Sequence, residues 1–359
     1  MRCICLANEL KHQGHRAHFI CRELSEPFSQ VISKAGHLLT LLPPLPADQF
    51  PLLPETPWAT ELQQADAQAS VSAITTLPIE WLIVDHYGLD FQWETILKPH
   101  TKTLLSIDDL GHRHNCDLLL DQNIYPDAAT RYLDLVPMAC QRLIGPQYAL
   151  LRPEFATARM QVQPRKGEVK HLLVCMGGMD RGNLTQRALE ALLSLDTCPP
   201  HIDVVIGAQH PATDHVAKLC NLLHAHLHVQ TQDMAYLSAK ADLAIGAGGI
   251  STWERCSLGL PALVLVVANN QANLAANAAA AGLIQQACRD SLTDTDTLTR
   301  EIESLIKNSE LRHKLSINGI KTVDGQGRTR VLEAAESIIK CNTQPVSYLD
   351  GQALRTTDD

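Results

Sequence analysis

The sequence has few aromatic residues and no excess of positive charge. Phe, Trp and Tyr make up 4% of its 359 residues, and 39 acidic residues outnumber 30 lysines and arginines, which gives a formal net charge of −9. Proteins that bind nucleic acid need a basic surface, and those that hold single strands also use aromatic rings as stacking platforms. We therefore expect no nucleic-acid partner.

Long apolar runs and paired cysteines are also missing. The longest apolar run, residues 260–268, is far shorter than the roughly 20 residues that a membrane helix needs. The amino terminus lacks the charged-then-apolar order of a secretion signal. The 11 cysteines form no CxxC pair, and disulfide frameworks belong to short secreted chains, so free thiols in a reducing compartment are the simpler interpretation. We expect a cytoplasmic protein with no membrane insertion.

The length is sufficient for two domains, each with its own core. Residues 159–168, RMQVQPRKGE, are charged and poor in apolar side chains, and they contain a proline, which is typical of a linker. We therefore predict an N-terminal domain at 1–158, a C-terminal domain at 169–340 and a polar tail at 341–359. Apolar runs alternate with helical patterns in both domains, which predicts two Rossmann-like α/β folds.

Three apolar runs of the first domain each end in polar residues. The runs cover residues 81–84, 102–107 and 118–120, and they lead into Asp85-His86-Tyr87, Asp108-Asp109 and Asp121-Gln122-Asn123. This is the pattern of a parallel sheet whose site lies at the carboxyl ends of its strands. A helix is predicted at 61–73, and the proline-rich segment from Gly36 to Leu62 is predicted to be a surface loop with short helical pieces.

The chain begins with a helical pattern instead of a strand. Leu6, Ala7 and Leu10 lie at helical spacing, and residues 16–21 then predict a strand. A parallel sheet normally opens with a strand that leads into the first helix, so the expected first strand is missing from this sequence. Because two neighbouring strand edges would then be open, we expect poor solubility.

The most informative stretch is residues 244–271, AIGAGGISTWERCSLGLPALVLVVANNQ, which predicts a strand, a glycine turn and a helix start. Glycines let backbone amides approach an anion, and a helix start favours a phosphate. Glu254 could accept hydrogen bonds from ribose hydroxyls. Tight packing of strand on helix is the alternative explanation of the glycines. The residues proposed to bind are Gly248, Gly249, Ser251, Thr252, Glu254 and Gln271.

A second glycine turn follows the strand predicted at 169–176. Gly178 belongs to this turn, and Asp180, Asn183 and Thr185 follow it at the start of the next helix. Residues of these types serve both as helix caps and as phosphate contacts, and the sequence leaves both roles open.

Metal binding is not expected. The first domain carries histidines and aspartates, but their spacing fits no standard site, and a His-Arg-His loop is more often solvated. The residues concerned are His86, Asp108, Asp109, His112 and His114. We expect no metal and no cofactor.

Four stretches together resemble the UDP-2,4-diacetamido-2,4,6-trideoxy-β-L-altropyranose hydrolases of pseudaminic acid biosynthesis. Residues 85–123 carry DHY, LD, WE, IDDL, CD and LLDQN elements in the family's order. The other matches are GPQYALLRPEF at 145–155, MGGMDRGNLTQRALEAL at 176–192, and GAGGISTWERCSLGLP followed by ANNQ within 246–271. Such ordered agreement is far more specific than a lone glycine motif.

This resemblance implies the GT-B architecture of the lipid II glycosyltransferase. It also implies metal-independent attack of water on a UDP-linked sugar, with inversion at the anomeric carbon. Tyr87 and Asn270 match positions that line the family's sugar site, and we expect them to orient the sugar while Glu254 contacts the ribose. A UDP-sugar-dependent glycosyltransferase and an inactive UDP-sugar-binding protein are the alternatives.

The amino terminus departs from the family pattern. Family members place a strand and a Gly-x-Gly-His loop before a Met-Arg-Cys helix, and the loop histidine is regarded as the catalytic base, whereas Met1-Arg2-Cys3 opens this sequence. Two explanations are open: a start codon assigned too far downstream, which we favour, or a truncated, inactive product. Without that histidine, His86 is the nearby candidate base. The tail faintly resembles the opening of an acetyltransferase domain fused to some members, which suggests association with an acetyltransferase of the pathway.

Overall fold

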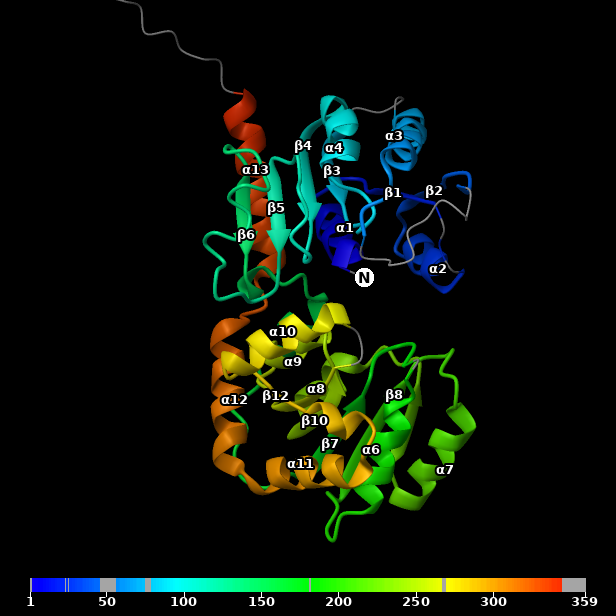
Figure 1. Ribbon diagram of the computed structural model, residues 1–359, viewed down its shortest axis with the longest axis vertical. Helices are drawn as coiled ribbons and strands as arrows, with labels where there is room; N and C mark the ends of the chain where they lie inside the picture. Colours follow the sequence, from blue (N-terminus) through cyan, green and yellow to red (C-terminus); the bar gives the residue numbers. More distant parts are fainter. Residues whose placement is uncertain are drawn as a thin grey trace, which may run out of the picture.

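The computed structural model has two α/β lobes stacked along its long axis (Figure 1). The structure describes residues 2–22, 24, 26–45, 56–74, 79–180, 182–266 and 269–343, without the side chains of 27, 269, 270 and 341–343. Within these residues, no helix is long and apolar enough to cross a membrane.

The main sheet of the first lobe is parallel, in the order β3-β4-β5-β6. The three strands predicted here are confirmed, and a fourth was missed; their bounds are β3 (Ile79–Val84), β4 (Thr101–Ile107), β5 (Leu118–Asp121) and β6 (Gln141–Ile144). Helices cover both faces of this sheet. They are α1 (Arg2–His12), α3 (Thr60–Ile74) and α4 (Phe91–Leu97), together with α13 (Gly327–Thr343) from the far end of the chain.

Successive residues of a strand point to opposite faces, and β4 illustrates this. Leu104 packs in one core with α3 and α4, whereas Leu105 packs with α1 and α13 in another. Burial on both faces explains why consecutive residues of β4 and β5, such as Leu104 and Leu105 or Leu118 to Leu120, are all apolar.

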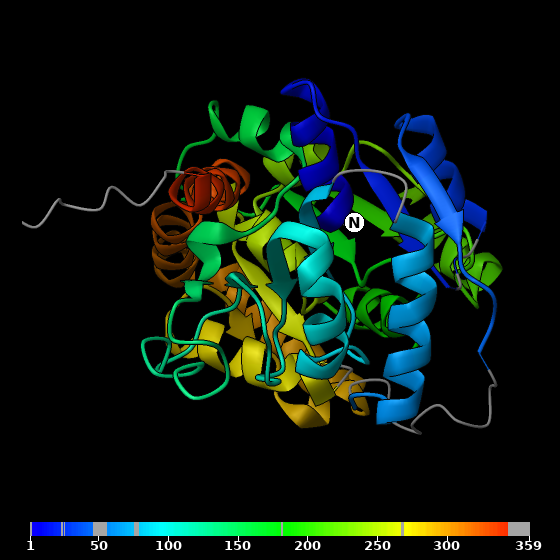
Figure 2. The ribbon, with the colours of Figure 1, turned by 90° about the horizontal axis from the view of Figure 1, so that it is seen from above.

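A separate pair of parallel strands lies at the end of the first lobe away from α13 in both views (Figures 1 and 2). It consists of β1 (His18–Cys21) and β2 (Leu38–Leu41), joined by α2 (Glu26–Lys34). The prediction of a loop from Gly36 onward is wrong for β2, because the four apolar and β-branched residues before the prolines pair with β1. Among the described strands, β1 pairs only with β2 and β3 only with β4.

The second lobe contains one parallel sheet in the order β12-β11-β10-β7-β8-β9. Its strands are β7 (His171–Cys175), β8 (His201–Ile206), β9 (His226–Val229), β10 (Leu243–Ala247), β11 (Ala262–Leu265) and β12 (Gln285–Gln286). Its helices are α6 (Leu184–Leu193), α7 (Thr213–Leu223), α8 (Met234–Lys240), α9 (Ser251–Ser257), α10 (Asn269–Ala280), α11 (Thr295–Lys307) and α12 (Ser309–Thr322). Short 3-10 turns are η2 (Lys98–His100), η3 (Pro146–Tyr148) and η4 (Arg289–Leu292).

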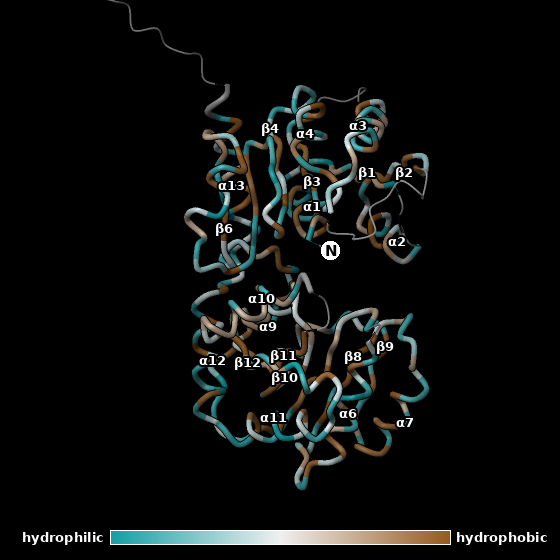
Figure 3. The backbone as a smooth tube through the Cα atoms, viewed as in Figure 1, coloured by the Kyte–Doolittle hydropathy of each residue, from teal (hydrophilic) through white to brown (hydrophobic). Residues whose placement is uncertain are grey.

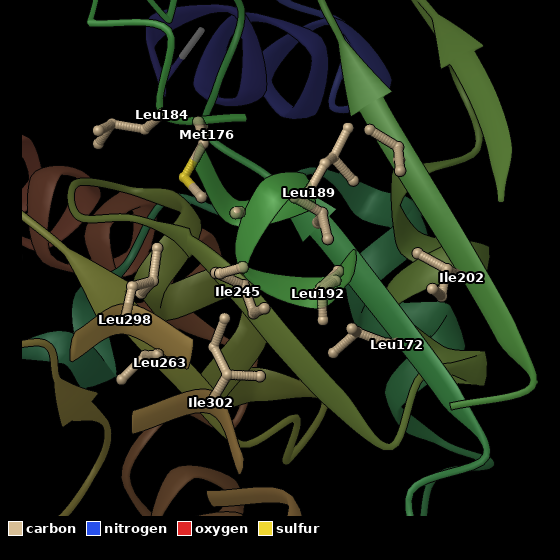
Figure 4. Close-up of a cluster of buried hydrophobic side chains, with 14 of the residues drawn as sticks. Leu172, Met176, Leu184, Leu189, Leu192, Ile202, Ile245, Leu263, Leu298 and Ile302 are labelled. Carbon is tan, nitrogen blue, oxygen red and sulfur yellow. The ribbon is translucent and has the colours of Figure 1, made fainter. Parts of the chain in front are cut away.

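Leucine and isoleucine side chains fill the space between this sheet and the helices on one of its faces. Figure 4 shows Leu189 and Leu192 of α6 and Leu298 and Ile302 of α11 close to residues of β7, β10 and β11. In Figure 3, the outer helix α11 changes between hydrophilic and hydrophobic along its length, as an amphipathic helix does. The α/β folds predicted for both halves of the chain are therefore confirmed.

Two helices pack on the lobe opposite to the domain that the sequence predicted for them. Val331, Leu332 and Ala335 of α13 are buried against the strands of the first lobe, so the second domain predicted at 169–340 ends before this helix. Phe155 of α5 (Pro153–Arg159) is buried in the core of the second lobe. The lobe that each helix covers was not evident from the sequence.

The predicted linker at 159–168 is fixed to the second lobe. Arg159 donates to the carbonyls of Ser257 and Ile320, and Arg165 donates to those of Ala239 and Leu258. Charged residues that suggested a solvated segment instead satisfy carbonyls at the ends of buried elements.

Candidate functional site between the lobes

Two glycine turns lie side by side at the centre of the second sheet. The chain builds β8 and β9 on one side of β7 and later places β10, β11 and β12 on the other, so the loops after β7 and β10 diverge. Gly246 of β10 is in register with Cys175 of β7, and the turns that follow are therefore neighbours. Ligands of open α/β sheets bind at such switch points.

The backbone of these turns requires glycine. Gly177 and Gly249 have φ values of 92° and 90°, a region that side chains other than glycine rarely adopt. A Cβ at Gly178 would meet no atom within 4 Å, so the first turn faces open space. The predicted strand, glycine turn and helix start at 244–271 are confirmed by β10 and α9.

Arg255 forms hydrogen bonds with the residues at the start of α9. Its guanidinium is buried and donates to the carbonyl of Ala247 at 2.8 Å and to the hydroxyls of Ser251 and Thr252 at 3.3 Å each. Thr252 is fully buried. It was predicted to touch a ligand, but the structure turns it inward, because a buried cation must have hydrogen-bond acceptors. Ser251 remains partly exposed.

Gln271 lies against the second glycine turn. A Cβ placed on Gly248 would be 3.3 Å from Gln271 Oε1, and this buried oxygen has no hydrogen-bond partner among the described residues. A buried amide oxygen normally accepts a hydrogen bond, so Gln271 can take a donor from a ligand. Asn270 lies in the first turn of α10, but its side chain is outside the described part.

Asp180 caps a helix. Its carboxylate accepts from the backbone N–H groups of Leu184 and Thr185 at 2.9 and 2.8 Å, and His210 Nε2 lies 3.2 Å away. Of the two roles left open by the sequence, the structure gives Asp180 the cap. Asn183 donates to Gln186 at 2.5 Å and keeps a buried Oδ1 without a partner in the described part of the chain.

The strand ends of the first lobe meet at Arg2. Its Nη2 lies 2.6 Å from Asp85 Oδ1 and its Nη1 lies 3.3 Å from Asp109 Oδ2, so the polar residues after β3 and β4 share one edge, as predicted. Tyr87 hydrogen-bonds with Asp109. Burial raises the pKa of the Tyr87 hydroxyl, and the charge of Asp109 raises it further. Tyr87 is therefore a neutral donor at physiological pH.

His86 is a neutral imidazole with one nitrogen occupied. Its Nδ1 accepts the backbone N–H of Gly88 at 2.9 Å, and its ring stands edge-on to Trp58 with centroids 4.7 Å apart. Burial lowers the pKa of His86. Because Nδ1 is the acceptor in the neutral ring, this geometry does not favour His86 as a base.

A buried ionic network supports this edge of the first lobe. His114 Nδ1 lies 2.7 Å from Glu94 Oε1, and His114 Nε2 lies 3.4 Å from Asp108 Oδ2. Burial by itself lowers the pKa of His114, but the two carboxylates raise it to about 10. The Tyr132 hydroxyl lies within hydrogen-bond distance of both Asp108 and Asp121. Burial raises the pKa of Asp121 to about 7. The expectation of a solvated His-Arg-His loop is wrong for His114.

The lobes contact each other at predicted site residues. Arg152 donates through Nε and Nη2 to Glu254 Oε1, each at 3.3 Å, and Trp253 Nε1 donates to Asn123 Oδ1 at 3.4 Å. Asn277 donates to the carbonyl of Ile124 at 3.0 Å. The glycine turns therefore face the strand ends of the first lobe. The contact of Arg152 with Glu254 was not predicted, although Arg152 lies in the GPQYALLRPEF stretch.

Two further observations concern metal-binding groups and a cavity outside the site. Among the described residues, no group of three or more His, Cys, Asp and Glu side chains could hold a metal ion. A cavity of about 750 Å³ lies between α5 and α8, lined by Glu154, Arg165, Tyr236 and Lys240 among others, and contains none of the predicted site residues.

The chain is similar to curated proteins over about half its length. It is 32% identical over 189 residues to the spore coat polysaccharide biosynthesis protein SpsG of Bacillus subtilis, covering 52% of this chain and 56% of that one. It is 30% identical over 181 residues to the UDP-2,4-diacetamido-2,4,6-trideoxy-beta-L-altropyranose hydrolase of Campylobacter jejuni, covering 50% and 62%. The chain thus spans about half the length of the curated relatives it matches. No family model matches.

Solved structures of low sequence identity share the fold. MurG of Acinetobacter baumannii superposes with a TM-score of 0.64 at 12% identity, over 94% of this chain and 95% of that one. The UDP-GlcNAc 2-epimerase of Neisseria meningitidis, solved with UDP-GlcNAc bound, superposes with a TM-score of 0.58 at 13% identity, over 94% and 98%. The predicted GT-B architecture with two Rossmann-like domains is confirmed.

Proposed function

We propose that this chain binds a UDP-linked 2,4-diacetamido-2,4,6-trideoxy sugar between its lobes and hydrolyses it to UDP and the free sugar. The observation that carries the proposal is the pair of glycine turns at the switch point, which faces the polar strand ends of the first lobe. Glu254 follows the second of these turns, in the first turn of α9, and is held there by Arg152. The similarity to the Campylobacter jejuni hydrolase supports the choice of substrate.

The second lobe holds the nucleotide in this proposal. Backbone amides of Gly178, Gly248 and Gly249 can approach the diphosphate, because no Cβ stands in the way. Donors fixed before the reaction stabilise the negative charge that develops as UDP leaves, without a metal ion. Glu254 accepts from the ribose, and Gln271 accepts from a hydroxyl or amide of the substrate.

The first lobe supplies the sugar side. A water oxygen attacks the anomeric carbon, the bond from that carbon to the diphosphate oxygen breaks, and UDP leaves with the electron pair. A base takes the proton of the water on the face opposite UDP, which inverts the configuration. Tyr87 and Asn270 orient the sugar. His86 would serve as the base only after its Nδ1 released the N–H of Gly88.

The test is release of UDP and free sugar from the UDP-linked diacetamido-trideoxy sugar with no acceptor present. A hydrolase produces the two in equal amounts. Dependence on an added acceptor would instead identify a glycosyltransferase, the activity in the names of several proteins that share the fold. Binding of UDP without any release of free sugar would identify a UDP-sugar-binding protein.

Tyr87→Phe tests the sugar side of the site. Loss of one hydrogen bond to a polar substrate group is worth roughly ten- to a hundredfold in kcat/KM. Tyr236→Phe is the matched control, because Tyr236 is 65% exposed on α8 and lies outside the proposed site. Equal activity of the two variants would remove Tyr87 from the mechanism.

We also propose that the reaction belongs to pseudaminic acid biosynthesis in the cytoplasm and that an acetyltransferase of the pathway associates with this chain. Copurification of that enzyme with the tagged protein would support the association, and its absence from the purified protein would oppose it.

A further inference from the structure

Arg152 is held firmly at the boundary of the lobes. It precedes α5, where the chain passes to the second lobe. Its Nη1 lies 3.1 Å from Glu154 Oε1, and its guanidinium stands over the ring of Phe155, 5.0 Å from the centroid. Phe155 is fully buried in the second lobe. Stacking on this buried ring, rather than the exposed Glu154, fixes the arginine before it reaches Glu254.

The contact with Glu254 occupies only one of its oxygens. Nε and Nη2 of Arg152 both donate to Oε1. Among the described residues, no donor contacts Oε2. The Glu254 side chain is 16% exposed, so it is not sealed from solvent. An ionised carboxylate accepts on both oxygens, and the free one can bind two adjacent hydroxyls.

We infer that Arg152 is a positioning residue that fixes Glu254 for the 2′,3′-diol of the ribose and so makes the site prefer a ribonucleotide to a 2′-deoxyribonucleotide. The inference rests on the proposed function, in which the ribose lies at Glu254. Its new content is that Arg152, at the point where the chain passes from the first lobe to the second, sets the nucleotide preference.

Electrostatics point in the same direction. Burial raises the pKa of the Glu254 carboxyl, and the charge of Arg152 opposes that rise. Arg152 therefore helps to keep Glu254 ionised as well as oriented. A protonated carboxyl would be a weaker acceptor for two hydroxyls.

The experiment compares the affinities of UDP and 2′-deoxy-UDP by titration calorimetry for the full chain and four variants. The wild type should prefer UDP about tenfold, the value of one charged hydrogen bond. Glu254→Gln and Arg152→Gln should both lose most of this preference, because UDP then loses the contacts of both hydroxyls and 2′-deoxy-UDP loses only that of its 3′-hydroxyl. Arg152→Lys should fall between, because lysine keeps the charge but cannot donate from two positions of a planar fork.

Glu154→Gln is the matched control. It removes the other carboxylate of Arg152, which is 42% exposed, and should leave both affinities unchanged. An Arg152→Gln variant that keeps the full preference for UDP, or loses affinity for both nucleotides equally, would overturn the inference. Failure of the wild type to bind UDP would overturn the proposed function itself. Loss of preference in Glu254→Gln alone would leave that function standing and dismiss Arg152.

Discussion

Replacing His114 by glutamine is the sharpest test of the first lobe. His114 lies between the buried carboxylates of Glu94 and Asp108, and its removal leaves them without a cation between them. Glutamine has similar size and can still donate one hydrogen bond, so the main change is the loss of the positive charge.

The structure gives the size of the effect. The rise in the pKa of His114 from 6.5 to about 10 corresponds to about 5 kcal/mol of folding free energy. Breaking a buried ion pair by removing one partner costs about 3–5 kcal/mol by an independent route. We therefore expect His114→Gln to lower the free energy of unfolding by about 3–5 kcal/mol at pH 6.5.

The effect must depend on pH with a definite sign. Because the pKa is higher in the folded state, the contribution of His114 is fully present below pH 6.5 and is lost as the pH rises towards 10. The difference between wild type and variant should shrink to about 1 kcal/mol or less near pH 10, where His114 in the folded wild type has lost about half of its positive charge. Urea unfolding followed by circular dichroism at both pH values measures it.

His112→Gln is the control for this experiment. His112 is on the same loop, but its Nδ1 is 3.8 Å from Asp108 Oδ1 and its side chain is 17% exposed. A partly exposed pair of this kind is worth about 1 kcal/mol at most. A His114→Gln effect below about 1 kcal/mol at pH 6.5, or one that stays constant up to pH 10, would refute the buried imidazolium.

Two further predictions concern the second lobe and its contact with the first. A Cβ at Gly207 would overlap the carbonyl oxygen of Gly178, whereas one at Gly178 meets open space. Gly207→Ala should therefore lower the melting temperature, and Gly178→Ala should leave the melting temperature unchanged but weaken UDP binding. A lower melting temperature for Gly178→Ala than for Gly207→Ala would count against the site. Trp253 is fully buried and donates to Asn123, so Trp253→Ala should cost about 3–5 kcal/mol in urea unfolding through the cavity that it leaves. Asn123→Ala should cost only about 1 kcal/mol, the value of a hydrogen bond, and equal costs would mean that packing is not the main term.

Local patterns in the sequence predicted the strands and glycine turns at the centre of the second lobe. The turn at Gly248-Gly249 followed from residues adjacent in the chain, because glycine is needed where φ is positive and the flanking apolar run has strand character. The strands β3, β4 and β5 were predicted for the same reason. The meeting of Asp85 and Asp109 followed from parallel pairing, which brings the carboxyl ends of neighbouring strands to one edge.

Contacts between distant residues were not predictable in this way. Thr252 is a residue type that is common in phosphate-binding turns, but its hydroxyl accepts a hydrogen bond from the buried guanidinium of Arg255. His114 looks solvated in the sequence, and only the packing of α4 against the sheet brings Glu94 beside it. Because the free energy of a buried charge depends on which partners the fold places around it, sequence spacing cannot fix such roles.

The sequence by itself determined two Rossmann-like lobes, the glycine turns and the polar strand ends, since each is encoded by residues a few positions apart. Only the tertiary structure decided that α13 covers the first lobe, that Asp180 caps a helix, and that Arg152 reaches Glu254. These depend on burial shared by segments far apart in the chain. An apolar helix face in the sequence indicates that the face is buried, but the surface against which it packs depends on the whole fold.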